Sequence, residues 1–349
     1  MKKNKKVLSI MVAAMLALTA CGGGAANPAP AEGEANGATE DTANKEKQII
    51  RISMGVNDKS PSYAGAAKFK ELVESKTDDF DVEIYHSSQI ADDRSAIEML
   101  QFGTLDIVIP STSPLVNFIP AYGVFDLPFT ITDPETADQV LDGPFGDKML
   151  ALLEEQNLIG LAWWENGFRQ LTNSVRPVEK IEDLKGLKVR TMENEIHLDL
   201  WRTLGANPTP MAFGELFTAL QQGTVDGQEN PFASIYQSKI YEVQDYMSNT
   251  NHVYTPFLFL FSKPIWEKLT PEQQEILKEA GIEAGKYNRE VNRKDDADSL
   301  EELRNILTYT EISPEELVRF QEAAKPIIDK YRDQIGAEVV DEYITEVSK

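Results

Sequence analysis

The chain has 349 residues, of which 34 are Lys or Arg and 57 are Asp or Glu, and its formal net charge at pH 7 is -23. This acidity makes nucleic acid and anionic lipid surfaces poor partners, so we exclude both as ligands of the folded body. The length is sufficient for two domains or for one bilobed body.

The first residues have the features of a secretory signal peptide. Lysines between positions 2 and 6 precede an apolar stretch at residues 7–17, which is too short to span a bilayer. Next comes a segment that resembles a bacterial lipobox, Leu18-Thr19-Ala20-Cys21. We therefore expect cleavage after residue 20 and a lipid anchor on Cys21, the only cysteine of the sequence. A chance cysteine after an ordinary signal peptide is the alternative.

A polar segment follows the cysteine. Residues 22–47 contain no large apolar side chain and are rich in Gly, Ala, Pro, Asn and Glu, so they cannot bury a core. We expect residues 21–47 to be a flexible tether for an extracytoplasmic body that is anchored to the cell membrane. Loss of residues 1–20 removes four lysines and no acidic residue, which changes the net charge from -23 to -27.

Two stretches of the body are similar at an offset of 120 residues, MLQFGTLD at residues 99–106 and ALQQGTVD at residues 219–226. Gly103 and Gly223 suit the left-handed position that ends a helix. Each glycine is preceded by apolar residues at helical spacing, namely Ile90, Ile97 and Leu100 in the first copy and Phe213, Leu216, Phe217 and Leu220 in the second. Each is followed by a predicted strand, at residues 104–109 and 224–228. Two helix-glycine-strand units favour two similar α/β lobes around a shared cleft, with chance similarity as the alternative.

Further runs of β-branched and aromatic residues predict strands at residues 49–56, 80–85, 158–164, 187–192 and 252–261. The runs 158–164 and 252–261 are long and apolar, and we interpret them as hinge strands between the lobes. Thr270-Pro271-Glu272 has the pattern of a helix start, and few breakers interrupt the next residues, so a long helix of about thirty residues is predicted. Another helix is predicted to begin at Ser313-Pro314-Glu315.

The search for catalytic motifs is negative. None of the three histidines has the spacing of a zinc-binding HExxH helix, and the sequence lacks a GxSxG elbow, a P-loop and a GxGxxG motif. We expect no catalytic residue, cofactor or metal.

Four ordered motifs are similar to those of the solute-binding subunit of tripartite ATP-independent periplasmic (TRAP) transporters, DctP type. They are NGFRQ (residues 166–170), DLKGLKVR (183–190), GANPTPMAF (205–213) and VDGQENP (225–231). The resemblance begins at Ile49 and implies an α/β, two-lobed periplasmic-binding-protein clamp with hinge strands and a long helix spanning both lobes. The body at residues 48–349 then divides into lobe I, at residues 48–165 and 257–290, and lobe II, at residues 166–256 and 291–349.

The resemblance also implies roles for individual residues. Arg190 matches the arginine that pairs with a substrate carboxylate, Arg169 a second basic residue, Asn230 a hydrogen-bonding amide and Phe213 an aromatic wall. Weaker polar contacts are implied for three residues of the first lobe, Asn57, Asp93 and Arg94. Some members that bind sialic acid have glutamate where this chain has Ser111, which disfavours sialic acid.

The residue types agree with this chemistry. A planar guanidinium offers two parallel N–H donors to a carboxylate, whereas lysine offers only a point charge. The alternatives are a salt bridge between the lobes for Arg190 and Arg169, a turn amide for Asn230 and a helix-face residue for Phe213.

The expected ligand is an organic acid, and the polar stretch after Arg190 together with residues 163–166 (WWEN) favours a hexuronate such as glucuronate. A C4-dicarboxylate and other carboxylates remain open. The implied partners are the small and large membrane subunits of a TRAP transporter, and we expect a monomer. Two other classes also remain open, a secreted enzyme acting on an acidic sugar and a binding protein of an ABC importer.

Overall fold

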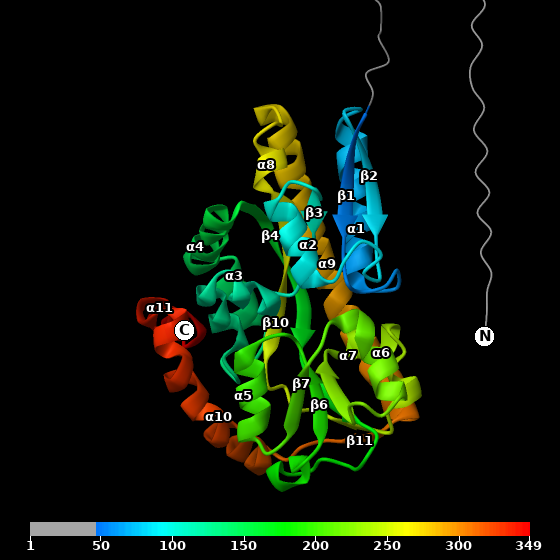
Figure 1. The fold of residues 1–349 in the computed structure, drawn as a ribbon, viewed down its shortest axis with the longest axis vertical. Coiled ribbons are helices and arrows are strands. Elements are labelled where there is room, and N and C mark those ends of the chain that lie inside the picture. Colours follow the sequence, from blue (N-terminus) through cyan, green and yellow to red (C-terminus); the bar gives the residue numbers. More distant parts are fainter. Residues whose placement is uncertain (1–46) are drawn as a thin grey trace, which may run out of the picture. The chain divides into compact units, whose positions relative to one another are not determined.

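The computed structural model describes residues 47–349 (Figure 1). The expected signal peptide, the cysteine Cys21 and the expected tether up to residue 46 lie outside the described residues. None of the helices in the described part is long and apolar enough to cross a membrane.

Two sheets divide these residues into two lobes, which confirms the expected fold class. The sheet of the first lobe has the strand order β2 (Phe80–Tyr85), β1 (Gln48–Ser53), β3 (Ile107–Val108), β10 (Tyr254–Ser262) and β4 (Leu158–Phe168). The sheet of the second lobe has the order β11 (Thr308–Thr310), β9 (Tyr246–Ser248), β5 (Gln170–Asn173), β8 (Gly227–Asn230), β6 (Lys188–Thr191) and β7 (Asn207–Pro210). Both sheets are mixed, because β10 runs antiparallel to its neighbours in the first and β5 does so in the second.

Helices pack against both sheets (Figure 1). The first lobe has α1 (Pro61–Lys76), α2 (Asp93–Gln101), α3 (Pro134–Leu141), α4 (Pro144–Leu152), α8 (Lys263–Trp266) and the 3-10 helices η1 (Ser113–Asn117), η2 (Pro120–Asp126) and η3 (Leu153–Gln156). The second has α5 (Glu195–Thr203), α6 (Phe213–Gln221), α7 (Phe232–Gln237), η4 (Ile181–Leu184) and η5 (Ile240–Val243). The chain continues through α9 (Pro271–Ile306) and ends with α10 (Pro314–Ile335) and α11 (Ala337–Val347).

The expected hinge strands and long helix connect the lobes. Strand β4 leads directly into β5 of the other sheet, and β9 leads back into β10. Helix α9 has 36 residues and begins with a capping box between Thr270 and Gln273, which satisfies its first backbone donors. It contacts α1 and β4 in the first lobe and α7 and β11 in the second.

Trp164 holds the long helix close to the first sheet. Its buried indole stacks on Phe259 of β10, with ring centroids 5.0 Å apart. Gly65 of α1 and Gly285 of α9 lie against the same indole, where an added Cβ would approach within 2.5 Å and 2.9 Å of it. Glycine at these two positions therefore permits the close approach of both helices.

The repeated LQxGT(L/V)D motif forms equivalent units in the two lobes. Gly103 follows α2 with a φ of 69°, and Gly223 follows α6 with a φ of 67°, as predicted. The aspartate at the end of each copy accepts a hydrogen bond from the backbone of a neighbouring strand. Asp106 accepts from Arg51 N at 3.0 Å, and Asp226 accepts from Lys188 N at 2.9 Å.

The strands after these glycines begin later than predicted. The first comprises only Ile107–Val108, and the second is Gly227–Asn230. The repeated aspartates explain the difference, because each side chain occupies a backbone donor of the adjacent strand at the position where ladder pairing would otherwise begin.

The C-terminal helices contact both lobes. Helix α10 packs against η2 and α5, and α11 packs against α3, α4 and η2. Helix α11 therefore packs on elements of the first lobe, although it lies in the range 291–349 that was expected for lobe II. The expected lobe boundaries stay predictions.

Candidate binding site

A cavity lies between the lobes and has a volume of about 650 Å³ when the open solvent at its mouth is included. This size is within the range of small-molecule sites. The lining residues that carry the argument below are Asp93, Arg94 and Ser111 from the first lobe and Arg169, Arg190, Glu193, Phe213 and Asn230 from the chain of the second, with Asn166 from β4.

Arg190 lies in β6 and is 2 % exposed. Its Nε and Nη2 donate to the carbonyl oxygen of Met211 at 2.9 Å and 2.6 Å, and its guanidinium carbon lies 5.9 Å from the centroid of the Phe213 ring. It forms no ion pair with any carboxylate of residues 47–349. The salt bridge between the lobes, considered above as the alternative role of Arg190, is therefore not found.

The positive charge of Arg190 is only partly balanced by the surrounding protein. Burial lowers its pKa to about 10, since the attraction of Glu229 only partly offsets the loss of water and the like charge of Arg169 opposes it. A guanidinium that loses water must be compensated, and a ligand carboxylate would supply that compensation.

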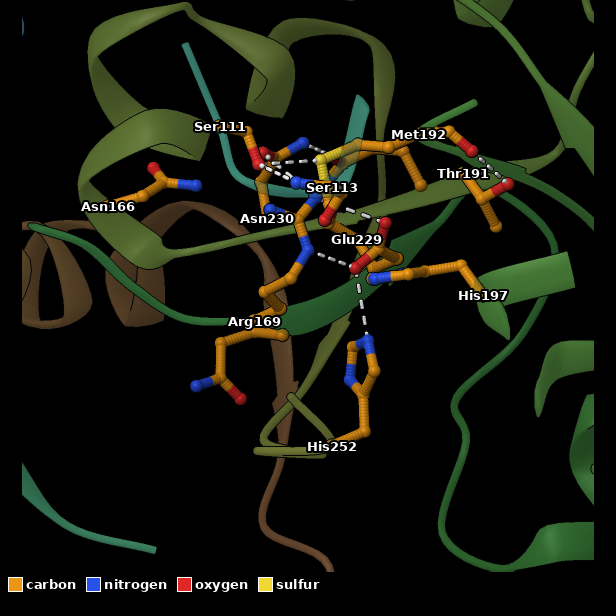
Figure 2. A network of polar contacts seen from close by, with 12 residues as sticks. Ser111, Ser113, Asn166, Arg169, Thr191, Met192, His197, Glu229, Asn230 and His252 are labelled. Carbon is orange, nitrogen blue, oxygen red and sulfur yellow. Dashed lines mark hydrogen bonds and ion pairs between the residues drawn. The ribbon is translucent and has the colours of Figure 1, made fainter. Parts of the chain in front are cut away.

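Arg169 lies between β4 and β5 and is fully buried. Its Nε pairs with Glu229 of β8, and its Nη2 lies 3.0 Å from Glu229 Oε1 and 3.2 Å from Asn230 Oδ1. Figure 2 shows this network. The remaining nitrogen, Nη1, is buried without a hydrogen-bond partner in the described chain. Glu229 thus balances the charge of Arg169, while one donor of this cavity-lining side chain stays unused.

Glu229 is held in its charged form. Burial raises its pKa, but Arg169 and His252 outweigh that effect and keep the pKa well below its usual range. His252 Nε2 lies 3.0 Å from Glu229 Oε2, and His252 Nδ1 lies 2.8 Å from Thr250 Oγ1. Burial lowers the pKa of His252, which favours its neutral form. These residues orient Arg169. The sequence reasoning assigned no role to Glu229 or His252, although Glu229 is part of the QENP motif.

Two asparagines lie at the cavity in different states. The Asn230 amide is engaged by the protein, since Oδ1 accepts from Arg169 and Nδ2 donates to Gln228 Oε1 at 2.5 Å. The Asn166 Oδ1 accepts from Ser234 Oγ at 3.3 Å, whereas Nδ2 has no hydrogen bond within residues 47–349. Asn166 thus offers a free donor. No individual contact was assigned to it from the sequence, although Asn166 ends the WWEN stretch and begins the NGFRQ motif.

Three residues of the first lobe were expected to contact the ligand, and of these Asp93 and Arg94 line the cavity and Asn57 does not. Asp93 accepts from Ser111 N at 3.2 Å, and burial raises its pKa to about 6. Arg94 lines the cavity with a half-exposed side chain, 3.7 Å from Glu98. Asn57 is not among the lining residues, and its Nδ2 instead donates to Gln237 O of the second lobe at 2.8 Å.

Buried polar contacts join the lobes beside the cavity. Asn194 Nδ2 donates to Ser113 O at 3.1 Å and to Asp126 Oδ2 at 2.8 Å, and His197 Nε2 lies 2.8 Å from Asp126 Oδ1. Ser113 Oγ also donates to Asp126 Oδ1. Nearer the cavity, Ser111 Oγ contacts Met192 Sδ at 3.4 Å (Figure 2). These contacts stabilise the observed arrangement of the two lobes.

The arrangement suits anion binding better than catalysis. Ser113 and His197 both contact the same carboxylate, so they do not form the nucleophile and base pair that acyl transfer needs. No group of His, Cys, Asp and Glu in the described part of the chain is placed to hold a metal ion.

The chain matches the family model "Bacterial extracellular solute-binding protein, family 7" over residues 52–334. A sugar acid binding protein of Advenella mimigardefordensis, solved with galactonate, is 39% identical with a TM-score of 0.85 and covers 86% of this chain and 98% of its own. A TRAP periplasmic solute-binding protein of Sulfitobacter, solved with β-D-galacturonate, is 31% identical with a TM-score of 0.81, and the match covers 86% of this chain and 99% of its own. The C4-dicarboxylate-binding protein DctB of Bacillus subtilis is 32% identical over 85% of each chain.

Proposed function

Because the chain belongs to bacterial extracellular solute-binding protein family 7, the DctP family of TRAP transporters, we propose that it captures a sugar acid in the cavity between its lobes. Its relatives are binding proteins of transporters, so the chain is a solute-binding protein and not an enzyme. It would deliver the acid to small and large membrane subunits of a TRAP transporter.

One observation carries this proposal: Arg190 is a buried guanidinium without a carboxylate partner in the described chain. Its Nε and Nη2 are oriented by one carbonyl oxygen, and the ring of Phe213 lies beside it. A ligand carboxylate that pairs with Arg190 would restore the charge balance that burial disturbs. Within residues 47–349, Arg169 Nη1 and Asn166 Nδ2 are further donors that have no hydrogen-bond partner, and both side chains line the same cavity.

Within the sugar acids we propose a hexuronate such as glucuronate. The support is the relative with bound galacturonate, together with an aromatic wall at Phe213 and polar groups from both lobes for ring hydroxyls. Aldonates are the direct competitor, since the relative with bound galactonate shares more identity. A C4-dicarboxylate is the second candidate, and the name of the DctB relative favours it.

The location of the protein follows from the same family. The family is extracytoplasmic. We propose further that cleavage after residue 20 leaves Cys21 lipidated, so that the body is tethered to the outer face of the cell membrane by residues 21–47. The support is the apolar stretch and the LTAC segment of the sequence.

Thermal unfolding of the purified body with a matched panel tests the function. The panel contains glucuronate, galacturonate, gluconate, galactonate and succinate, with glucose as the uncharged control. A ligand at a hundred times its dissociation constant adds about 2.7 kcal/mol to the free energy of unfolding, which raises Tm by several degrees. We expect the sugar acids to raise Tm, with glucuronate strongest, and glucose to leave it unchanged. A shift with succinate alone would replace the sugar-acid assignment by the dicarboxylate one.

A further inference from the structure

The cavity is electrically polarised. Its two arginines from the second lobe, Arg169 and Arg190, share the lining with two carboxylates, Asp93 at the start of α2 and Glu193 after β6. Neither carboxylate has an ion-pair partner within residues 47–349. Asp93 accepts one backbone hydrogen bond, from Ser111 N, and the one hydrogen bond of Glu193 within the described part of the chain is accepted by its carbonyl oxygen from Asn117 Nδ2.

The other charged lining residues do not neutralise this pair. Asp92 is engaged at the start of α2, where it accepts from Ser95 N at 3.0 Å and from Ser95 Oγ at 2.9 Å. The Arg94 side chain is 48% exposed and lies 3.7 Å from Glu98, so water screens its charge.

Asp93, Glu193 and Arg190 act on one another electrostatically. The pKa of Asp93 is raised mainly by burial, and the charges of Asp92 and Glu193 raise it further, while Arg190 opposes the shift. Asp93 and Glu193 in turn favour the charged form of Arg190. Because Asp93, Glu193 and Arg190 all line the cavity, the two carboxylates share one space with a guanidinium that has no ion-pair partner in the described chain.

We propose that Asp93 and Glu193 form an acidic wall that accepts the hydroxyl groups of a bound sugar acid and excludes a second carboxylate. This inference rests on the proposed function, and it defines the substrate class as polyhydroxy acids with one carboxylate. An ionised carboxyl group only accepts hydrogen bonds, so it pairs with a hydroxyl donor. A second ligand carboxylate beside it finds neither a donor nor an opposite charge, and like charges in a little-screened site repel. Specificity of this kind arises from penalising the wrong ligand.

Matched ligand pairs test the inference. Gluconate and glucarate differ only at one end, where glucarate has a second carboxylate in place of a primary alcohol, and galactonate and galactarate form the second pair. In the pair whose monoacid binds more tightly, calorimetric titration of the wild type should show an affinity for the monoacid about tenfold or more above that for the diacid. Asp93→Asn and Glu193→Gln should each reduce that preference by about threefold or more, because each removes one repelling charge.

The control is Glu195→Gln, which removes the same charge two residues away from Glu193, at an exposed position outside the lining. It should leave the preference unchanged, and circular dichroism should show all variants folded. Monoacids and diacids that bind the wild type equally, or a preference that persists in both variants, would overturn the acidic wall while leaving the proposed function intact. Absence of binding by any sugar acid would overturn the proposed function and this inference with it.

Discussion

His197 of α5 and Asp126 at the end of η2 form a hydrogen bond of 2.8 Å between the two lobes, and both side chains are buried. Asn194 adds two further bonds across the same junction. These contacts therefore stabilise the observed arrangement of the two lobes beside the cavity.

Weakening this junction should reduce ligand affinity from outside the cavity. Asn194→Ser keeps an oxygen at the N-cap of α5, where Asn194 now accepts from Ile196 N, but it is too short to reach Ser113 and Asp126. We expect small-angle scattering of the variant without ligand to show a larger radius of gyration than that of the wild type. Affinity for the sugar acid should fall by about tenfold, because part of the binding free energy is then used to bring the lobes together. Saturating ligand should restore the compact curve. Identical curves and affinities for both proteins would show that the junction does not control closure.

Arg190→Ala should abolish tight binding while leaving the fold intact. The ligand carboxylate would lose its partner in an enclosed site, which costs roughly 3 to 5 kcal/mol and weakens binding by a factor on the order of 10² or more. Arg190→Lys keeps the charge but loses the planar pair of donors, so it should remain impaired. Arg169→Ala tests the second arginine, and we expect it to lower stability as well, because the buried Glu229 would lose its arginine partner and keep only His252. Calorimetric titration measures affinity, with circular dichroism as the folding control; near-wild-type binding by folded Arg190→Ala would remove Arg190 from the site.

The Arg169 and Glu229 pair should contribute to stability in a pH-dependent way. Glu229→Gln leaves Arg169 buried and uncompensated, so we expect the free energy of unfolding to fall by roughly 3 to 5 kcal/mol at pH 7. The folded-state pKa of Glu229 is lowered, so its contribution to the free energy of unfolding is complete above the unfolded value of about 4.5, and it declines as the pH falls from there toward the folded-state pKa. Glu242→Gln is the control, since its exposed pair with Lys239 should contribute under about 1 kcal/mol. Urea denaturation at pH 7 and pH 4 measures both; a difference between Glu229→Gln and wild type that is the same at the two pH values would contradict this account.

Asp296 of α9 should have the opposite pH dependence. Burial raises its pKa to about 7, with Glu165 and Asp295 adding to the shift, while its Oδ1 accepts from Ala233 N at 2.9 Å. Because the folded-state pKa is raised, the favourable contribution of Asp296 to the free energy of unfolding is complete below about pH 4 and is lost as the pH rises to 7. Asp296→Asn keeps the acceptor without the charge, so it should raise Tm at pH 8 and have little effect at pH 4. Thermal unfolding at both pH values measures this, and a variant less stable than wild type at pH 8 would show that the charge is favourable.

Cys21→Ser tests the proposed anchor. If Cys21 carries the only membrane attachment, the variant should appear in the soluble fraction, because the acidic body has little affinity for an anionic lipid surface. Cell fractionation with metabolic labelling by a radioactive fatty acid measures both location and lipid. Unchanged membrane association of Cys21→Ser, with no label on the wild type, would count against lipidation.

Local sequence signals were sufficient to predict the limits of several helices and strands. Gly103 and Gly223 end their helices in the left-handed conformation, and the start of α9 at Pro271 was predicted from its cap residues. Strand β2 was predicted with its observed limits, residues 80–85. Such features depend on a few neighbouring residues, so they can be predicted from the sequence without tertiary contacts. The four family motifs likewise indicated two lobes, whereas the carboxylate-binding role that they imply for Arg190 stays a prediction.

Only the tertiary structure decided which polar side chains are free for a ligand. Arg169 and Glu229 are 60 residues apart in the sequence, and their pairing leaves Arg190 as the uncompensated guanidinium at the cavity. Asn57 forms a bond to Gln237 and leaves the cavity, whereas Asn166 keeps a free donor there. Hydrogen-bond partners of this kind depend on how the lobes pack. A sequence pattern therefore cannot tell which of two similar polar side chains already has a partner within the protein.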